Sequence, residues 1–503
     1  MATGSLWAFA VALLPPLYTF ATSVTVARFL GAAGLGRITF IGFVQSTLGV
    51  VLVMGLPLSI MRHVGEARGS GHSGRIRPLI RSLARPVVGL ALLGSVSLAM
   101  VGLLGGEPRY AWVLAGIACA GGVLQAIPSA VLVGIQRWRD AYIVGLSSGA
   151  VALAAKVVVL VAGGGITWLF AIDAVIVTIN LLGTSLIAHR ATRRILPADE
   201  PVGDLPRRVW RFASIAAVGV FINFVVYRRT EVFFLERFST DTQVALYSVP
   251  FSLVETLILL PKTVGTVIAP AVATLFGAGR HDRIASGFNR ALRIVLPLSF
   301  FATAGAVALG PTFIRLLYGS EFDRSGTVLV ILISTLPFVP LMAVSASVLL
   351  GIGKQWVPIG IGAVAALCNI GLDLWLIPSY DAIGAAVANT GAQIVGSLPL
   401  AFYASKCVGS TLAIGPLVRA GVGAALAGGV TAAVVTELPP VAAVPAGAAT
   451  FILVALPAAL VLRVVSSDDR AWLQAVGPVH LVRPIAQAAR ILGRTLSSPL
   501  DER

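Results

Sequence analysis

The residues most able to do chemistry in this chain are charges that lie inside long apolar segments. One segment contains Arg228, Arg229 and Glu231, and the next contains Glu255 and Lys262. An ionisable side chain in the middle of a bilayer costs about 2.5–3.5 kcal/mol on insertion scales, so it usually faces a partner or a water-filled cavity. Arginine and lysine would attract an anion there, and arginine can bind two phosphate oxygens at once. The pattern predicts a cationic site inside the membrane.

The spacing of these charges limits how they can pair. Arg228 and Glu231 are three residues apart and share one helix face. Glu255 and Lys262 are seven residues apart, so they lie on one side of a helix but about 10 Å apart by rise. Each is therefore expected to meet another helix or water. Two roles stay open for Glu231 and Glu255, which either weaken the hold on an anion or bind H⁺ or Na⁺. Arg229 has a second interpretation, in which its side chain extends to the external rim.

Another pair of charges lies on either side of a glycine-rich turn. Counted from Gly165, Lys156 lies nine residues before the turn and Asp173 eight residues after it. Their side chains would reach nearly the same depth on antiparallel helices, and an ion pair would compensate two costly charges. We interpret Lys156 and Asp173 as a structural ion pair rather than a ligand site. Asp373, near the end of a later segment, is interpreted as a helix-end residue.

These charges must be positioned by membrane-spanning helices. About fourteen apolar segments of about twenty residues fill the sequence, and twenty residues at about 1.5 Å rise cross a hydrocarbon layer of about 30 Å. Hydrophobic residues make up 57% and charged residues 12% of the chain, against about 25% charged in a soluble domain. The fold class predicted is an all-α integral membrane protein. The predicted spans are 6–27, 38–61, 86–105, 111–134, 142–163, 167–188, 212–235, 244–276, 294–317, 326–350, 358–378, 383–405, 417–436 and 441–464.

The net charge of +16 is concentrated in loops on one side of the predicted membrane. Basic blocks at 62–85, 190–211 and 280–293 follow the second, sixth and eighth spans. Because cytoplasmic loops are enriched in Lys and Arg, we expect a multi-pass protein of the cell membrane with both termini in the cytoplasm. We expect the basic loops to contact anionic membrane lipids, and expect no nucleic acid as a partner.

Two short echoes indicate an internal duplication. Arg28-Phe29 recurs as Arg237-Phe238, at an offset of 209 residues. The run from Leu132 to Arg137 recurs at Leu349–Lys354, at an offset of 217 residues. The echoes keep the same order at nearly the same spacing, which is typical of parallel repeats in transporters.

The duplication divides the sequence into four predicted parts. They are an N-terminal six-helix lobe at 1–204, a C-terminal six-helix lobe at 205–408, two additional helices at 409–466 and a cytoplasmic tail at 467–503. The tail is either an interfacial amphipathic helix or a loosely ordered segment. The three cysteines have no motif spacing, so we expect no disulfide, metal site or cofactor. The sequence has no P-loop, H-E-x-x-H or nucleophile elbow, so we expect no catalytic residues and no enzyme activity.

Several short motifs occur in order between about Trp7 and Val464. They are Ala27–Gly31 with Gly34-Leu35-Gly36, Val244–Ser248, Leu317–Phe322, and the run from Asn369 through Asp373 and Pro378 to Ala386. With these motifs the chain resembles the polysaccharide transporters, the Wzx-type lipid-linked oligosaccharide flippases of the multidrug/oligosaccharidyl-lipid/polysaccharide (MOP) exporter superfamily. The resemblance implies two lobes in a V-shaped, MATE-like arrangement, with two extra C-terminal helices.

The resemblance also implies a function. Such proteins translocate polyprenyl-diphosphate-linked oligosaccharides by alternating access, so Arg28 would join Arg228, Arg229 and Lys262 as cavity charges. It implies as partners the lipid-linked substrate, the glycosyltransferases and polymerase of a polysaccharide pathway, and H⁺ or Na⁺ as coupling ion. Many relatives have an aspartate at the position of Glu231, which leaves the role of this acid open.

Two other functions compete with this one. A multidrug or organic-cation antiporter of the same superfamily would need net acidic charge in its cavity and usually twelve spans. A membrane-embedded glycosyltransferase or ligase usually has sizeable loops with catalytic residues, whereas each external loop here has about ten residues or fewer. The fourteen predicted spans and the adjacent arginines favour the flippase.

Overall fold

The computed structural model describes residues 2–195, 200–227, 230–410, 414–462 and 464, and over these residues the chain is almost entirely helical. Short 3₁₀ turns at Ser73–Arg75 and Ser320–Phe322 precede two of the helices. The α-helices described are α1 (Ala2–Val53), α2 (Leu56–Gly69), α3 (Ile76–Leu103), α4 (Arg109–Gly134), α5 (Trp138–Val161), α6 (Ile166–Ile195), α7 (Leu205–Tyr227), α8 (Thr230–Phe238), α9 (Asp241–Gly277), α10 (His281–Tyr318), α11 (Asp323–Ile333), α12 (Phe338–Gly351), α13 (Trp356–Val408), α14 (Ile414–Glu437) and α15 (Pro440–Val461).

Within these residues, ten helical segments are long and apolar enough to cross a membrane. Two of them each cover most or all of two predicted spans. Gly31 (φ 70°, ψ −175°) interrupts α1 between the first and second predicted spans, and Asp381 (φ 50°, ψ −130°) interrupts α13 between the eleventh and twelfth. The seventh and eighth predicted spans coincide with α7–α8 and α9, where some residues are not described. The fold is that of an all-α membrane protein, as the sequence predicts.

The chain divides into two compact units. Unit 1 comprises Met1–Ser252 and Ile370–Ala385, and unit 2 comprises Leu253–Asn369 and Ala386–Arg503. Both α9 and α13 contribute to each unit. These units are not the same segments as the predicted lobes, because α7, α8 and the first third of α9 belong to unit 1. The lobes at 1–204 and 205–408 stay a prediction, and the tail at 467–503 lies outside the described residues.

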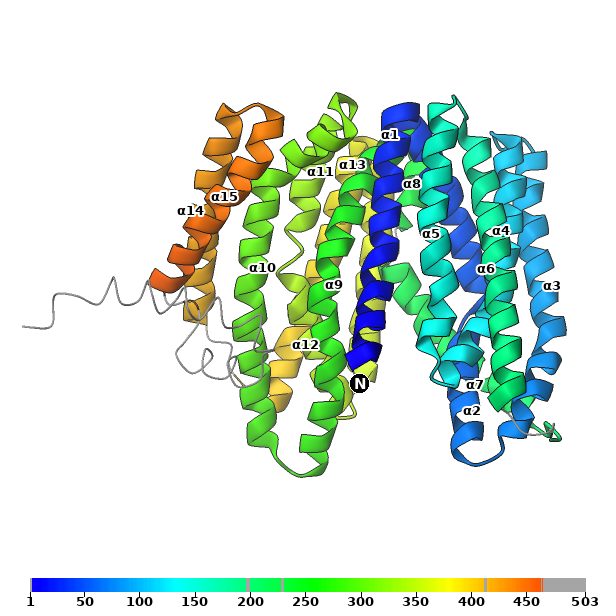
Figure 1. The fold of residues 1–503 in the computed structure, drawn as a ribbon. Coiled ribbons are helices and arrows are strands. Elements are labelled where there is room, and N and C mark those ends of the chain that lie inside the picture. The colour runs from blue at the N-terminus through cyan, green and yellow to red at the C-terminus, as the bar shows by residue number, and fades with distance from the viewer. Residues whose placement is uncertain (1, 196–199, 228–229, 411–413, 463, 465–503) are drawn as a thin grey trace, which may run out of the picture. The chain divides into compact units, whose positions relative to one another are not determined.

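Unit 1 is built around α4, which packs against α3 and α6 (Figure 1). A β-carbon at Gly116 of α4 would lie 2.6 Å from the Ser95 carbonyl oxygen of α3, so glycine is required where these backbones meet. The core includes Val64, Leu79 and Trp112, all of them buried. Burying such side chains against one another contributes about 1.5–3 kcal/mol each in a soluble protein, whereas in lipid close packing and hydrogen bonds drive the association of helices.

Unit 2 is built around α10, which packs against α12, α14 and α15 (Figure 1). Its core includes Phe288, Leu292 and Val348, which are nearly inaccessible. The helices α14 and α15 form a pair along α10, in the region where the sequence predicts two additional spans.

Large apolar side chains are also exposed on the outside of each unit. Trp168, Trp356 and Leu453 keep 63%, 74% and 73% of their surface accessible. A water-exposed protein would bury such side chains, whereas the hydrocarbon of a bilayer would cover them at no cost.

Both units contain the same packing contact at the positions of the second echo. In unit 1, a β-carbon at Gly134 of α4 would lie 2.8 Å from the Val64 side chain of α2. In unit 2, a β-carbon at Gly351 of α12 would lie 2.7 Å from the Val272 side chain of α9. The two glycines are aligned by the echo offset of 217, and the two valines are 208 residues apart, close to the first echo offset of 209. The two glycines aligned by the second echo therefore make the same kind of contact with a valine, one in each unit.

Candidate functional site

Three of the four predicted cationic residues have no described side chain. Arg228 and Arg229 fall between α7 and α8, outside the described residues. Lys262 belongs to α9, but its side chain is also outside the description. Arg28 lies on α1, three residues before the interruption at Gly31, and its side chain is exposed. The binding role of these four residues stays a prediction.

Two acidic residues meet in the interior of unit 1. Glu231, in the first turn of α8, is 1% exposed, and Asp373 of α13 is fully buried. The two carboxyl groups are close enough for the charge of Glu231 to act on Asp373. The structure therefore places two acidic side chains, from α8 and α13, in one buried region of unit 1. Asp373 lies eight residues before the interruption of α13 at Asp381, so it is near the end of that part of the helix, as the sequence predicts, and it is completely buried.

Glu255 has a different environment. It lies on α9 in unit 2 and its side chain is exposed, whereas Glu231 is buried. The sequence assigns the same two roles to both glutamates. The structure separates them, since Glu231 is buried in unit 1 and Glu255 is exposed in unit 2.

The contact predicted between Lys156 and Asp173 is present. Lys156 Nζ lies 2.7 Å from Asp173 Oδ1, and the side chains are 14% and 36% exposed. A second polar contact joins the same helices, because Ser148 Oγ donates a hydrogen bond of 2.8 Å to Asn180 Oδ1. Two polar contacts between α5 and α6 support the interpretation of this ion pair as structural.

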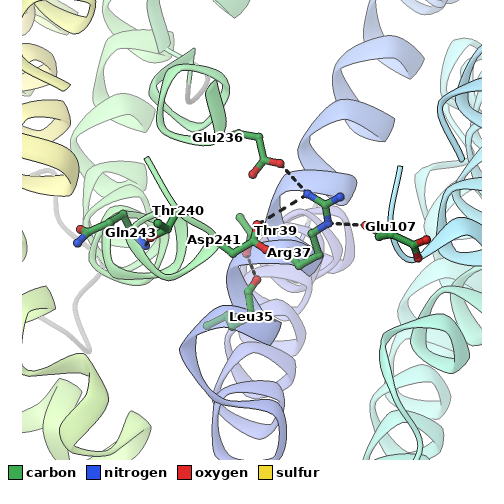
Figure 2. A network of polar contacts seen from close by, with 8 residues as sticks. All are labelled: Leu35, Arg37, Thr39, Glu107, Glu236, Thr240, Asp241 and Gln243. Atoms are coloured by element: carbon green, nitrogen blue, oxygen red, sulfur yellow. Dashed lines mark hydrogen bonds and ion pairs between the residues drawn. The ribbon is translucent and has the colours of Figure 1, made fainter. Parts of the chain in front are cut away.

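A further cluster of charges lies at one end of unit 1. We call Arg37, Glu236 and Asp241 the Arg37 cluster (Figure 2). Arg37 Nη1 lies 2.6 Å from Glu236 Oε1 and 3.8 Å from Asp241 Oδ1. Its Nε donates a hydrogen bond of 2.6 Å to the Glu107 carbonyl oxygen, in the loop between α3 and α4. One guanidinium thus joins α1, the α8–α9 turn and the α3–α4 loop.

The electrostatics of the Arg37 cluster are unbalanced, since two carboxylates face one arginine. Burial raises the pKa of Glu236 above its usual value, and repulsion from Asp241 raises it further. Arg37 opposes both effects. Sequence reasoning missed this cluster because its members lie in loops and helix ends, where charges are ordinary. One feature of the sequence could have indicated the cluster. Arg37 is a basic residue on the predicted external side, where few basic residues are expected.

No group of three or more His, Cys, Asp or Glu side chains that could hold a metal ion occurs in the described part of the chain. The candidate groups that the structure describes are the buried acidic pair and the Arg37 cluster, both in unit 1.

Comparison with known proteins agrees with this arrangement of helices. A family model described as "Lipid II flippase MurJ" matches residues 242–443. A solved structure of the lipid II flippase MurJ in an inward closed conformation is 15% identical and has a TM-score of 0.69, over 91% of this chain and 98% of that one. The chain has the MurJ fold. No curated protein matches the sequence.

The MurJ fold is shared with multidrug transporters. An inward-facing MATE family transporter of the MOP superfamily is 16% identical, with a TM-score of 0.61 over 78% of this chain and 94% of that one. A Vibrio cholerae MATE transporter is 15% identical, with a TM-score of 0.55 over 81% of this chain and 98% of that one. The expected MATE-like architecture is confirmed, while the matching family model is MurJ rather than a Wzx-type flippase.

Proposed function

We propose that this chain is a flippase that moves a polyprenyl-diphosphate-linked saccharide across the cytoplasmic membrane by alternating access. The observation that carries the proposal is the match of the lipid II flippase model to residues 242–443, within a chain that has the MurJ fold over 91% of its length. Lipid II and the repeat unit of a polysaccharide are the two substrate classes that the sequence motifs and the family match support.

The chemistry of such a substrate explains the charges. A glycan cannot cross hydrocarbon unaided, because each hydroxyl would lose water without a replacement hydrogen bond. A wet cavity supplies that replacement. Arg28, Arg228, Arg229 and Lys262 would bind the diphosphate, and arginine can do so with two parallel hydrogen bonds. The prenyl tail stays in the bilayer.

The acidic pair gives this transport a means of coupling. Glu231 and Asp373 are acidic side chains in one buried region, and a proton or a monovalent cation bound there would offset their negative charge. A site that binds the ion in one conformation and releases it in another converts an ion gradient into a conformational bias. Glu255, which is exposed, is the weaker candidate for this role.

The protein would act in the cell membrane with both termini in the cytoplasm, where the basic loops contact anionic lipids. Its substrate would come from the glycosyltransferases of a cell-envelope pathway and pass to a polymerase. The chain itself would catalyse no covalent step.

Multidrug or organic-cation antiport is the second candidate, favoured by the TM-score of 0.61 with a MATE transporter. Reconstitution into vesicles separates the two. Fluorescent lipid II, a fluorescent polysaccharide repeat unit on the same carrier, and an organic cation are tested in parallel for transfer between leaflets or uptake. Protein-dependent transfer of either lipid-linked sugar supports the proposal. Uptake of the organic cation alone would replace the flippase with the antiporter.

A further inference from the structure

The Arg37 cluster connects parts of unit 1 that are far apart in sequence. Arg37 follows the interruption of α1 at Gly31, while Glu236 and Asp241 lie on either side of the α8–α9 turn. These are the turn after the first predicted span and the turn after the seventh. Both turns, and the α3–α4 loop that supplies the Glu107 carbonyl, are predicted on the external side.

The backbones also touch at this point. A β-carbon at Gly36 would lie 1.7 Å from the Asp241 carbonyl oxygen, so α1 and the first turn of α9 are in direct contact. The α8–α9 turn is held from another direction as well, because Ser239 Oγ donates a hydrogen bond to Asp381 Oδ1, at the interruption of α13. Glycine at position 36 is therefore what allows the two backbones to approach this closely.

We propose that Arg37, Glu236 and Asp241 form an external gate, in which Arg37 holds the α8–α9 turn against α1 and releases it when the protein opens outward. The inference rests on the proposed alternating-access function, and it adds to it the residues that close the external end. Arg37 is the central member, since it is the cation that joins two carboxylates and a carbonyl oxygen. Without it, Glu236 and Asp241 would repel each other.

The gate should also respond to external pH. The charged groups that act on Glu236 are Arg37 from α1 and Asp241 from α9, while Asp381 of α13 binds the adjacent Ser239. Because the pKa of Glu236 is raised in the closed gate and would return toward about 4.3 once exposed, the closed gate binds a proton more tightly than the open one. Protonation therefore favours closure, and the gate weakens as the pH rises through the raised pKa.

Exposure of a buried residue behind the gate tests this directly. Ser248 lies seven residues after Asp241, on the same face of α9, and is 4% exposed. Ser248→Cys is nearly isosteric and is introduced into the full chain after the three native cysteines, Cys119, Cys368 and Cys407, have been replaced by alanine. The probe is a membrane-impermeant thiol reagent, applied to either side of membrane vesicles. Tyr110→Cys, at a position that is 70% exposed at the start of α4, gives the reference labelling rate at each pH.

We expect Arg37→Gln to raise the labelling rate of the Ser248→Cys thiol at least fivefold, and only for reagent added on the external side. Arg237→Ala is the matched control, since Arg237 is exposed and its guanidinium lies over the Phe238 ring. An equal rise in the control, no rise with Arg37→Gln, or a rise from the cytoplasmic side alone would overturn the gate.

The pH response gives a second measurement that needs no destabilising variant. In the parent, labelling normalised to the Tyr110→Cys reference should be slower at pH 5 than at pH 8, and Glu236→Gln should remove the difference. Faster labelling at pH 5, or a difference that survives Glu236→Gln, contradicts the proton-dependent closure. Labelling needs no substrate, so a working gate with no lipid-linked sugar transfer in vesicles would reject the proposed function and leave the gate standing. Transfer of such a sugar, with equal labelling of the parent and the Arg37→Gln variant, would support the proposed function and reject the gate.

Discussion

Gln136 and Gly353 occupy the same position in two helix-ending turns that lie 217 residues apart. At the end of α4, the Arg137 N–H donates to the Leu132 carbonyl at 2.8 Å, and at the end of α12 the Lys354 N–H donates to the Leu349 carbonyl at the same distance. Both are Schellman turns, which require one residue in the left-handed region. That residue is Gln136 (φ 64°) in the first copy and Gly353 (φ 81°) in the second.

The two copies should respond differently to substitution. Gly353→Gln would place a β-carbon in open space, so only the strained backbone opposes it, and the stability should fall by about 1 kcal/mol. Gln136→Ala should change the stability by less than about 0.5 kcal/mol, because the native residue already has a side chain in this conformation. Thermal unfolding in detergent measures both. Equal losses of stability in the two variants would show that the left-handed conformation of the turn residue does not determine the effect of the substitution.

The contact between Gly36 and Asp241 predicts a steric difference between two glycines of α1. Gly36→Ala would place a β-carbon 1.7 Å from the Asp241 carbonyl oxygen, whereas Gly42→Ala would meet no atom within 4 Å. We expect Gly36→Ala to destabilise the protein by about 2 kcal/mol or more, as overpacking does. Gly42→Ala should be neutral or stabilise by up to about 1 kcal/mol, since alanine favours a helix interior. The same thermal measurement serves, and a tolerated Gly36→Ala would contradict the close approach.

The contribution of Lys156 and Asp173 to stability should depend on both residues being present. Lys156→Met or Asp173→Leu alone leaves one charge without its partner and should destabilise by about 1–2 kcal/mol, less than a fully buried pair because Asp173 is 36% exposed. The double variant should lose less than the sum of the single losses. A structural pair also predicts that the double variant retains transport, and abolished transport in a folded double variant would assign the pair a direct role.

The acidic pair should set the ion dependence of transport. Glu231→Gln and Asp373→Asn each leave one carboxyl at the site, so the repulsion that favours proton or cation uptake disappears. We expect each variant to lose most of the dependence of flipping on pH or Na⁺ while the protein stays folded. Glu255→Gln, at an exposed position, is the comparison. If only Glu255→Gln flattens the profile, coupling belongs to α9 and not to the buried pair.

The cationic residues should be required for binding of the diphosphate. Arg228→Ala and Lys262→Ala are each expected to reduce transfer of a lipid-linked sugar at least tenfold without loss of folded protein, because each removes a charge-assisted contact with phosphate. Lys406→Ala removes an exposed cation that lies over the Phe402 ring and should leave transfer unchanged. Normal transfer in both of the first two variants would discard them as substrate ligands.

The sequence alone predicted those features whose physical cause lies within one helix or between two helices joined by a short turn. Apolar runs of about twenty residues predict spans because the thickness of hydrocarbon sets the length of a helix, and ten helical segments of the described chain bear this out. The depth of Lys156 and Asp173 follows from counting along two helices joined by one tight turn, so their contact could be predicted. The recurrence of Leu132–Arg137 at Leu349–Lys354 likewise encodes a turn made within six residues.

The tertiary structure alone decided which distant groups meet. Glu231 and Asp373 are separated by several helices, and Arg37 and Glu236 by 199 residues, so no local spacing relates them. Asp373 is an ordinary carboxylate by position, and it becomes a candidate coupling residue only because α8 buries Glu231 beside it. The physical reason is that hydrophobic length and helix period act within a segment, whereas desolvation and charge repulsion depend on which segments the fold brings together.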